Sequence, residues 1–297
     1  MQTQVNGGEP QKRVSIQTIL RQTPDLPAMP AALIKVLQAT DGSDSNARLV
    51  AQAVSMDQSL SARVLRMANS SFYGLSRKVT TLQEAVVLLG FRSVRQLALL
   101  AGTQSWLSRP LPGYDLAPKA LMVHSFSVAT GAQMIAKLSK YEEHDTVFVT
   151  GLLADIGKIA LSNVFDGKLQ LLVQLGIQAG MTFDQVERHV IGVDHAEVGA
   201  HLAESWNLPQ DIIDGIRWHH MPSHSSKNPA IADCIHIADF MAMSVGCGLG
   251  GDGLLYEFDE EALQRRGISA DDLDKIIDDF VIAFEAFEAV VEELTGE

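Results

Sequence analysis

Helix start and stop signals recur along this chain, and they constrain its fold more than any other feature of the sequence. Thr81 is followed three residues later by Glu84, the pattern of a capping box, in which each side chain satisfies an orphan backbone donor. An apolar run follows and ends at Gly90, where a C-cap glycine is expected, and Ser93 then opens a further helix. We find no series of alternating apolar and polar segments of the kind that indicates strands. The sequence therefore predicts an all-α fold.

A proline-rich segment divides the predicted helices into two groups. Residues 108–118 contain three prolines and a glycine, and proline cannot continue a helix because it lacks the backbone N–H. We therefore expect a flexible or disordered N-terminus over residues 1–15 and an N-terminal helical subdomain over residues 16–108. A second helical subdomain is expected over residues 119–297.

The C-terminal residues predict a long amphipathic helix. Ser269 is a candidate N-cap, and acidic residues occupy the first turn, where the helix dipole favours negative charge. Apolar residues then recur at alternating steps of four and three from Leu273 to Leu294, which is a seven-residue repeat. Two interpretations remain open. The helix covers its own core, or its apolar seam pairs with a partner helix or forms a homodimer.

Net charge excludes some classes of partner. The chain carries a formal charge of −13, and a strongly acidic protein repels nucleic acid and anionic membrane surfaces. The charge is uneven, because residues 1–110 hold 12 Lys+Arg and 6 Asp+Glu while the remainder holds 11 and 30, giving balances of +6 and −19. The N-terminal part could therefore meet an acidic partner or dock on the acidic part of its own chain.

The expected location is the cytoplasm. The first eleven residues are polar and carry no apolar signal-peptide stretch. No apolar run approaches the roughly 18 residues needed to span a bilayer. The two cysteines, Cys234 and Cys247, lack the CxxC spacing and are expected to be reduced.

Ionisable side chains lie within or beside apolar helical stretches at four places. Such groups are costly to bury unless they are paired or bound to a metal. Imidazole and carboxylate groups together suit divalent ions such as Fe, Zn or Mn. The four places hold Asp155 with Lys158, His195, His219 with His220, and Asp239.

These residues, preceded by His124, resemble in their order the HD superfamily of metal-dependent phosphohydrolases. The N-terminal half resembles a narrower group, the HDOD (HD-related output domain) family. The resemblance covers about residues 20–245 and implies an HD-like helical bundle after residue 119. The segments that carry it are 26–30, 56–74, 82–90 and 187–209.

The resemblance also implies roles for single residues. One metal would take His124, Asp155 and Asp239, and Lys158 would lie near a substrate phosphate. A second metal would take Asp155 with His195, His219 and His220. Ala154 stands where the superfamily has the histidine of its His-Asp pair, so the first set lacks a ligand. We therefore expect one divalent metal, with a metal-free hydrogen-bonded network as the alternative. His124 and Asp239 are the weaker candidates.

HDOD domains are commonly outputs of bacterial signalling systems. Ala154, and the absence of a Gly-Tyr-Pro motif after His220, favour a regulatory interaction module without hydrolase activity, acting through a protein partner. That motif marks the branch that hydrolyses cyclic di-GMP. Two alternatives stay open: a metal-dependent phosphohydrolase with an altered HD site, and a module that binds a nucleotide without cleaving it.

Overall fold

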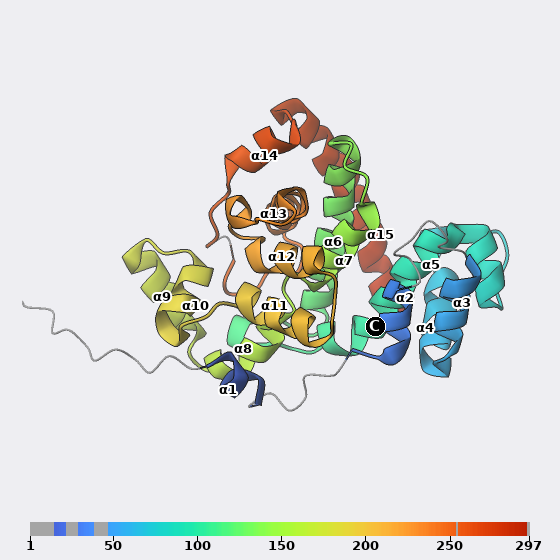
Figure 1. Ribbon diagram of the computed structural model, residues 1–297, viewed down its shortest axis with the longest axis horizontal. Helices are drawn as coiled ribbons and strands as arrows, with labels where there is room; N and C mark the ends of the chain where they lie inside the picture. Colours follow the sequence, from blue (N-terminus) through green and yellow to red (C-terminus); the bar gives the residue numbers. More distant parts are fainter. Residues whose placement is uncertain (1–14, 22–28, 39–46, 254, 296–297) are drawn as a thin grey trace, which may run out of the picture.

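The computed structural model describes residues 15–21, 29–38, 47–253 and 255–295 (Figure 1). Over these residues the fold is helical and contains no β-sheet, so the all-α prediction is confirmed. The flexible N-terminus that we expected over residues 1–15 lies outside the described residues, apart from Ser15.

The N-terminal helices, except the first, are grouped at the right of Figure 1. Helices α2, α3 and α4 pack around α5, whereas α1 lies beside α8 of the second group. A short 3₁₀ turn, η1, links α4 to the loop that leads into α5. The bounds are α1 (Ile16–Arg21), α2 (Ala31–Gln38), α3 (Ala47–Ser55), α4 (Gln58–Ala68), η1 (Ser71–Tyr73) and α5 (Leu82–Leu107).

Helix α5 begins where the sequence predicted but continues past its glycine. The Glu84 backbone N–H donates to Thr81 Oγ1 at 3.1 Å, while the Glu84 carboxylate accepts from Thr80 rather than Thr81, so half of the predicted capping box forms. Gly90 has φ 83° and ψ 156°, which only glycine adopts readily, so the first helical segment of α5 ends there and a second resumes directly after the kink. Ser93 lies inside the continuing helix and is not an N-cap.

The second group of helices follows the proline-rich segment, which contains a 3₁₀ turn, η2 (Pro112–Tyr114), enclosed by an isolated β-bridge between Leu111 and Leu116. Helices α6, α7, α11, α12 and α13 form the bundle at the centre of Figure 1, and α9 and α10 project to its left. The bounds are α6 (Ala120–Leu138), α7 (His144–Leu153), α8 (Gly157–Phe165), α9 (Leu169–Ala179), α10 (Phe183–Ile191), α11 (His195–Ser205), α12 (Gln210–Trp218), η3 (Pro222–His224), α13 (Pro229–Ser244), α14 (Glu260–Arg266) and α15 (Ala270–Thr295).

The two groups of helices share a hydrophobic core. The Trp106 ring at the end of α5 lies 5.6 Å from the Trp206 ring at the end of α11, measured between centroids. Apolar residues from both sides of the proline-rich segment form one continuous buried cluster. Its members include Ile19, Leu33, Leu60, Leu100, Leu121, Ile216 and Phe287.

Helix α15 places its apolar seam on the chain's own core. Phe280, Phe287 and Val291 are buried, and the Phe287 ring stacks on Phe126 of α6 at 3.6 Å. The Leu294 side chain lies outside the described residues. The other described members of the seven-residue repeat, Leu273, Ile277 and Phe284, are half-buried against the same chain.

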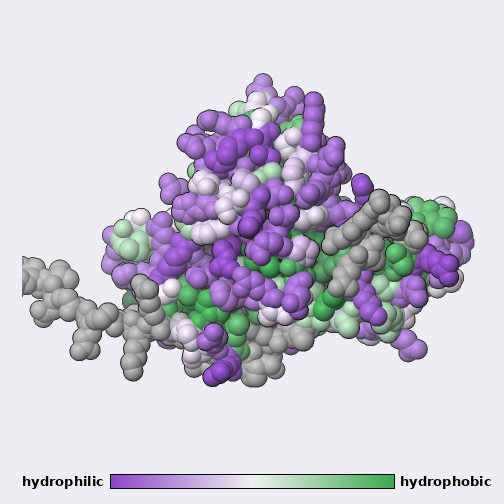
Figure 2. Space-filling model, in the orientation of Figure 1, coloured by the Kyte–Doolittle hydropathy of each residue, from purple (hydrophilic) through white to green (hydrophobic). Residues whose placement is uncertain are grey.

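Two helical stretches are apolar and long enough to cross a membrane by composition alone, which differs from our expectation. They are Leu82–Leu107 and His144–Phe165, and 56% and 89% of their most apolar windows are buried in the fold. Burial of this extent is typical of core helices. The face in Figure 2 is mainly hydrophilic, above all over α12, α13 and α14.

Candidate metal centre

The sequence-predicted site residues converge inside the helical bundle, although they come from five segments of the chain. His124 lies on α6 and Asp239 on α13, two helices that pack against each other. Asp155 follows α7, and His195 is the first residue of α11, which Asp194 caps by accepting the Glu197 N–H. The carboxylates and most of these imidazoles are buried. The set is His124, Asp155, Lys158, His195, His219, His220 and Asp239.

Four of these side chains direct donor atoms at a common point. The ligand atoms of Asp155, His195, His219 and His220 all lie within 4.8 Å of one another. Asp155 Oδ1 is 3.3 Å from His195 Nε2 and 3.8 Å from His219 Nε2. The Nε2 atoms of His195 and His220 are 2.8 Å apart. One carboxylate oxygen and three imidazole nitrogens could therefore hold a single metal ion.

The other predicted ligand group is closed by its own hydrogen bonds. His124 Nε2 lies 2.9 Å from Asp239 Oδ1 and 3.2 Å from Asp155 Oδ2, and its Nδ1 lies 3.0 Å from the backbone oxygen of Cys247. Lys158 Nζ is 3.2 Å from the same Asp155 oxygen. Ala154 is buried at the end of α7 and offers no donor atom. The polar side-chain atoms of His124, Asp239 and Lys158 are therefore already paired within this group.

The carboxylates and two of the histidines form a charged network. Burial alone would raise the pKa of Asp155, but the Lys158 charge and the hydrogen bonds of His124 and His195 hold it well below its usual range. Burial would lower the pKa of His124, yet Asp155 and Asp239 raise it to about 10. Likewise, Glu187 and Asp155 outweigh burial and raise the pKa of His195 to about 10.

The other two histidines of the centre, His219 and His220, have pKa values below the usual imidazole range. Burial and the charge of His195 lower the pKa of His219. Burial and the neighbouring imidazoles of His219 and His195 hold the pKa of His220 well below its usual range. A neutral imidazole can bind a metal without first losing a proton, as these two residues could, whereas His195 would have to release its Nε2 proton to the solvent on binding the ion.

One buried side-chain atom among the four ligand candidates lacks a hydrogen-bond partner. His219 Nδ1 lies 2.7 Å from the backbone oxygen of Ile216, which fixes the ring, but His219 Nε2 makes no hydrogen bond although the side chain is fully buried. A buried polar atom without a partner is rare and costly. Because this nitrogen faces Asp155 at the convergence point, the donor set fits a metal ion.

Glu187 was not identified from the sequence, although it supports the centre directly. It lies on α10, is fully buried, and its Oε2 is 2.7 Å from His195 Nδ1 and accepts the His195 backbone N–H at 2.9 Å. Tyr114 donates its hydroxyl to Glu187 Oε1 at 2.5 Å. A carboxylate on the far nitrogen of a histidine orients the ring toward a metal. The sequence signals of Glu187 were its place eight residues before His195 and its position at the start of the HDOD-like segment 187–209.

A glycine-rich loop covers the centre, and two of its residues were also missed. Asp252 accepts hydrogen bonds from Lys158 Nζ and from the Tyr256 hydroxyl, both at 2.9 Å. The Tyr256 ring stacks on His220 at 4.4 Å. The cavity between the loop and Lys158 measures about 10 Å³, which is room for about one water molecule. A wider hollow of about 440 Å³ borders His220.

Comparison with known proteins identifies relatives of this sequence and fold. Residues 26–222 match the HDOD domain family. A solved structure of an HDOD domain protein of unknown function from Geobacter sulfurreducens is 26% identical, with a TM-score of 0.74 over 94% of this chain and 96% of that one. A protein from Shewanella amazonensis, described as a candidate phosphohydrolase, is also 26% identical, with a TM-score of 0.67 over 92% and 97%.

A sequence relative differs from this chain in length. An uncharacterized protein of Treponema pallidum is 26% identical over 205 residues, which is 68% of this chain. This chain matches only 39% of the length of that relative.

Proposed function

Because this chain belongs to the HDOD domain family, we propose that it is a regulatory interaction module whose buried His/Asp centre binds one divalent metal without turning over a substrate. The metal would be held by Asp155, His195, His219 and His220. A divalent ion in such a site neutralises the carboxylate and fixes the imidazoles. The module would act through a protein partner, in keeping with the signalling role that the family resemblance implies.

The enclosure of the centre supports this proposal over catalysis. Asp252 pairs with Lys158, and the cavity lined by His124, Asp155 and Lys158, of about 10 Å³, is too small for a phosphate ester. A wider hollow of about 440 Å³ borders His220 but none of the other three ligand candidates, and Tyr256 stacks on the His220 ring. In addition, Lys158, which could otherwise meet a phosphate, already pairs with Asp155 and Asp252.

The alternative is a metal-dependent phosphohydrolase with an altered site. It draws on the Shewanella relative, which is described as a candidate phosphohydrolase. It also draws on the complete second ligand set, since a metal held by histidines and a carboxylate can activate water for attack on a phosphate ester. For this activity the loop that carries Asp252 would have to open.

Metal content and turnover distinguish the two functions. Protein purified without added metal or chelator should hold about one equivalent of a divalent metal, measured by mass spectrometry of the elements. Asp155→Ala and His220→Ala should each lose it, while Asp166→Ala, which changes an exposed aspartate, should retain it. Circular dichroism checks that each variant is folded.

A screen of nucleotides, cyclic dinucleotides and simple phosphate esters with Mn, Fe or Mg completes the test. We expect no turnover above that of Asp155→Ala. Turnover that depends on Asp155 would replace the proposal with the phosphohydrolase. If the folded wild-type protein holds no metal, the centre is a hydrogen-bonded network and the metal proposal is wrong.

A further inference from the structure

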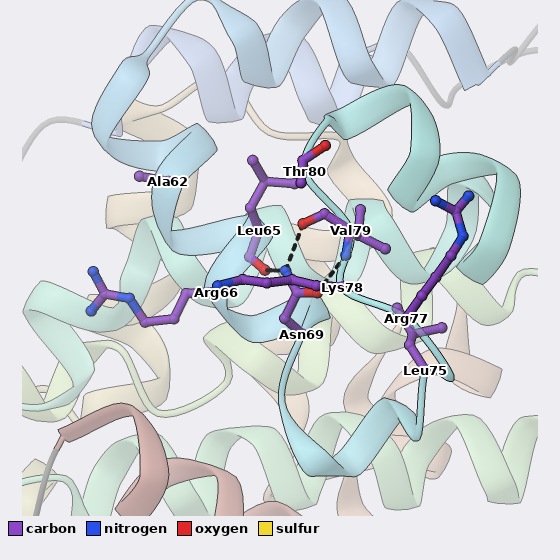
Figure 3. A pocket seen from close by; sticks show the side chains of 9 residues that line it. All are labelled: Ala62, Leu65, Arg66, Asn69, Leu75, Arg77, Lys78, Val79 and Thr80. Atoms are coloured by element: carbon purple, nitrogen blue, oxygen red, sulfur yellow. Dashed lines mark hydrogen bonds between the residues drawn. The ribbon is translucent and has the colours of Figure 1, made fainter.

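A basic groove lies in the N-terminal part of the molecule, away from the His/Asp centre. It runs between α4 and the loop that leads into α5 and has a volume of about 800 Å³ (Figure 3). Leu65 and Leu75 contribute apolar surface, and three cationic side chains line it: Arg66, Arg77 and Lys78. In Figure 3, Arg66 and Arg77 extend to opposite sides and Lys78 lies between them.

The groove is held in shape by one side chain. Asn69 Nδ2 donates to the backbone oxygens of Leu65 and Val79, at 2.7 and 2.8 Å, and Asn69 Oδ1 accepts the Val79 N–H at 2.7 Å. These bonds, drawn in Figure 3, tie the loop to the end of α4. A preformed groove loses little conformational entropy on binding.

The cations of the groove are poorly neutralised. Arg77 pairs with Glu84 at 3.2 Å, but this pair is exposed and easily exchanged. Among the described residues, no carboxylate lies within ion-pair distance of Arg66 or Lys78, and both side chains are exposed. The positive groove therefore stands out on a chain whose net charge is −13.

A surface of opposite charge is present on the same chain. The buried residues of α15 occupy one side of that helix, so its opposite side faces solvent. Exposed residues recur there at steps of three and four, which places them in one stripe. We call this the acidic stripe, and it consists of Asp271, Asp274, Asp278, Ile282 and Glu285. Ile282 is 66% exposed, as the one large apolar residue of the stripe.

We propose that the basic groove binds the acidic stripe of a second copy of this chain. The aspartates and Glu285 would meet Arg66, Arg77 and Lys78, and Ile282 would cover Leu65 and Leu75. Pairing through the apolar seam of α15 would require Phe280 and Phe287 to leave the chain's own core, where both are buried. The residues of the acidic stripe are exposed, so they can contact a second copy while the chain stays folded.

The charge distribution favours this occupant over nucleic acid. A polyanion would meet the acidic remainder of the chain, whereas a second copy presents its acids as a compact stripe beside one apolar side chain. The inference does not depend on metal binding, so it can fail or succeed separately from the proposed function.

Charge reversal with complementation tests the pairing. Sedimentation velocity at low ionic strength, over a concentration series, should show that the full-length wild type self-associates and that added salt weakens the association. Arg66→Glu with Lys78→Glu should weaken it by about tenfold or more, as should Asp274→Lys with Asp278→Lys. An equal mixture of the two double variants should restore association, because each groove then meets a stripe of opposite charge.

Lys137→Glu with Lys168→Glu is the matched control, since it makes the same charge change at exposed sites elsewhere. Association should survive in this variant. A wild type that stays monomeric throughout the series would overturn the proposal. So would association that persists in both groove and stripe variants, or a mixture that fails to restore it while both variants remain folded.

Discussion

At the scale of single residues, the ligand candidates could be predicted from the sequence but their supports could not. His195, His219 and Asp155 stand out because ionisable groups inside apolar helices need a reason to be there. Glu187 lies among other polar residues of α10, and Asp252 lies in a glycine-rich loop. Their roles depend on contacts across 8 and 94 residues, which no local pattern records.

Glu187→Gln should weaken metal binding at the centre without unfolding the protein. Glutamine keeps the size of the side chain and an acceptor for His195 but loses the negative charge. We expect the fold to persist and metal affinity to fall about 10- to 100-fold, the usual cost of losing a partner of a metal-bound histidine. Competition with a chromogenic chelator measures this. Glu204→Gln, at an exposed position, is the control and should leave the metal affinity unchanged. Equal metal affinities in the two variants would mean that Glu187 does not support the centre.

At the scale of elements, caps were predicted better than bends. Ser269 accepts the Asp272 N–H at 3.2 Å at the start of α15, as the sequence indicated. Gly90 carries a C-cap signal and has a non-helical backbone conformation, and the chain resumes a helix at once, with Phe91 and Val94 of the next turn packed on the core. A glycine can therefore join two helical segments at a kink as well as end a helix, and the residues packed after it distinguish the two cases.

The close contact of α8 and α11 should be sensitive to one methyl group. A Cβ at Gly157 would lie 1.9 Å from the backbone oxygen of His195, so Gly157→Ala must push the two helices apart. We expect a loss of about 1–3 kcal/mol in the free energy of unfolding, together with loss of metal, since His195 moves. Urea unfolding measures the first effect and metal analysis the second.

Gly267→Ala is the comparison for Gly157→Ala. Gly267 has φ 64° and open space around it, so alanine there should cost about 1 kcal/mol from backbone strain alone. It should leave the metal in place. If both variants behaved alike, close packing of α8 on α11 would not explain the requirement for glycine at 157.

At the scale of the whole molecule, α15 packs against both groups of helices. It packs on α6 of the second group and also contacts α4 and η1 of the first. The sequence predicted this helix and its apolar seam but left open what the seam covers, since a repeat of seven serves a coiled coil and an internal contact equally well. Only the three-dimensional arrangement decides between them.

Phe287→Ala should therefore destabilise the entire protein. Removing a buried ring that stacks on Phe126 should cost about 3–5 kcal/mol in urea unfolding. Ile282→Ala, on the exposed side of the same helix, should change stability by no more than about 0.5 kcal/mol. A small effect of Phe287→Ala would mean that α15 is dispensable for the fold.

The continuous core has a consequence for how this architecture is inherited. Because residues on both sides of the proline-rich segment bury the same cluster, neither group of helices would keep its apolar surface covered if the chain were cut there. Gene rearrangement can therefore transfer the two groups only together. The family match agrees with this, since residues 26–222 cross the proline-rich segment without a break.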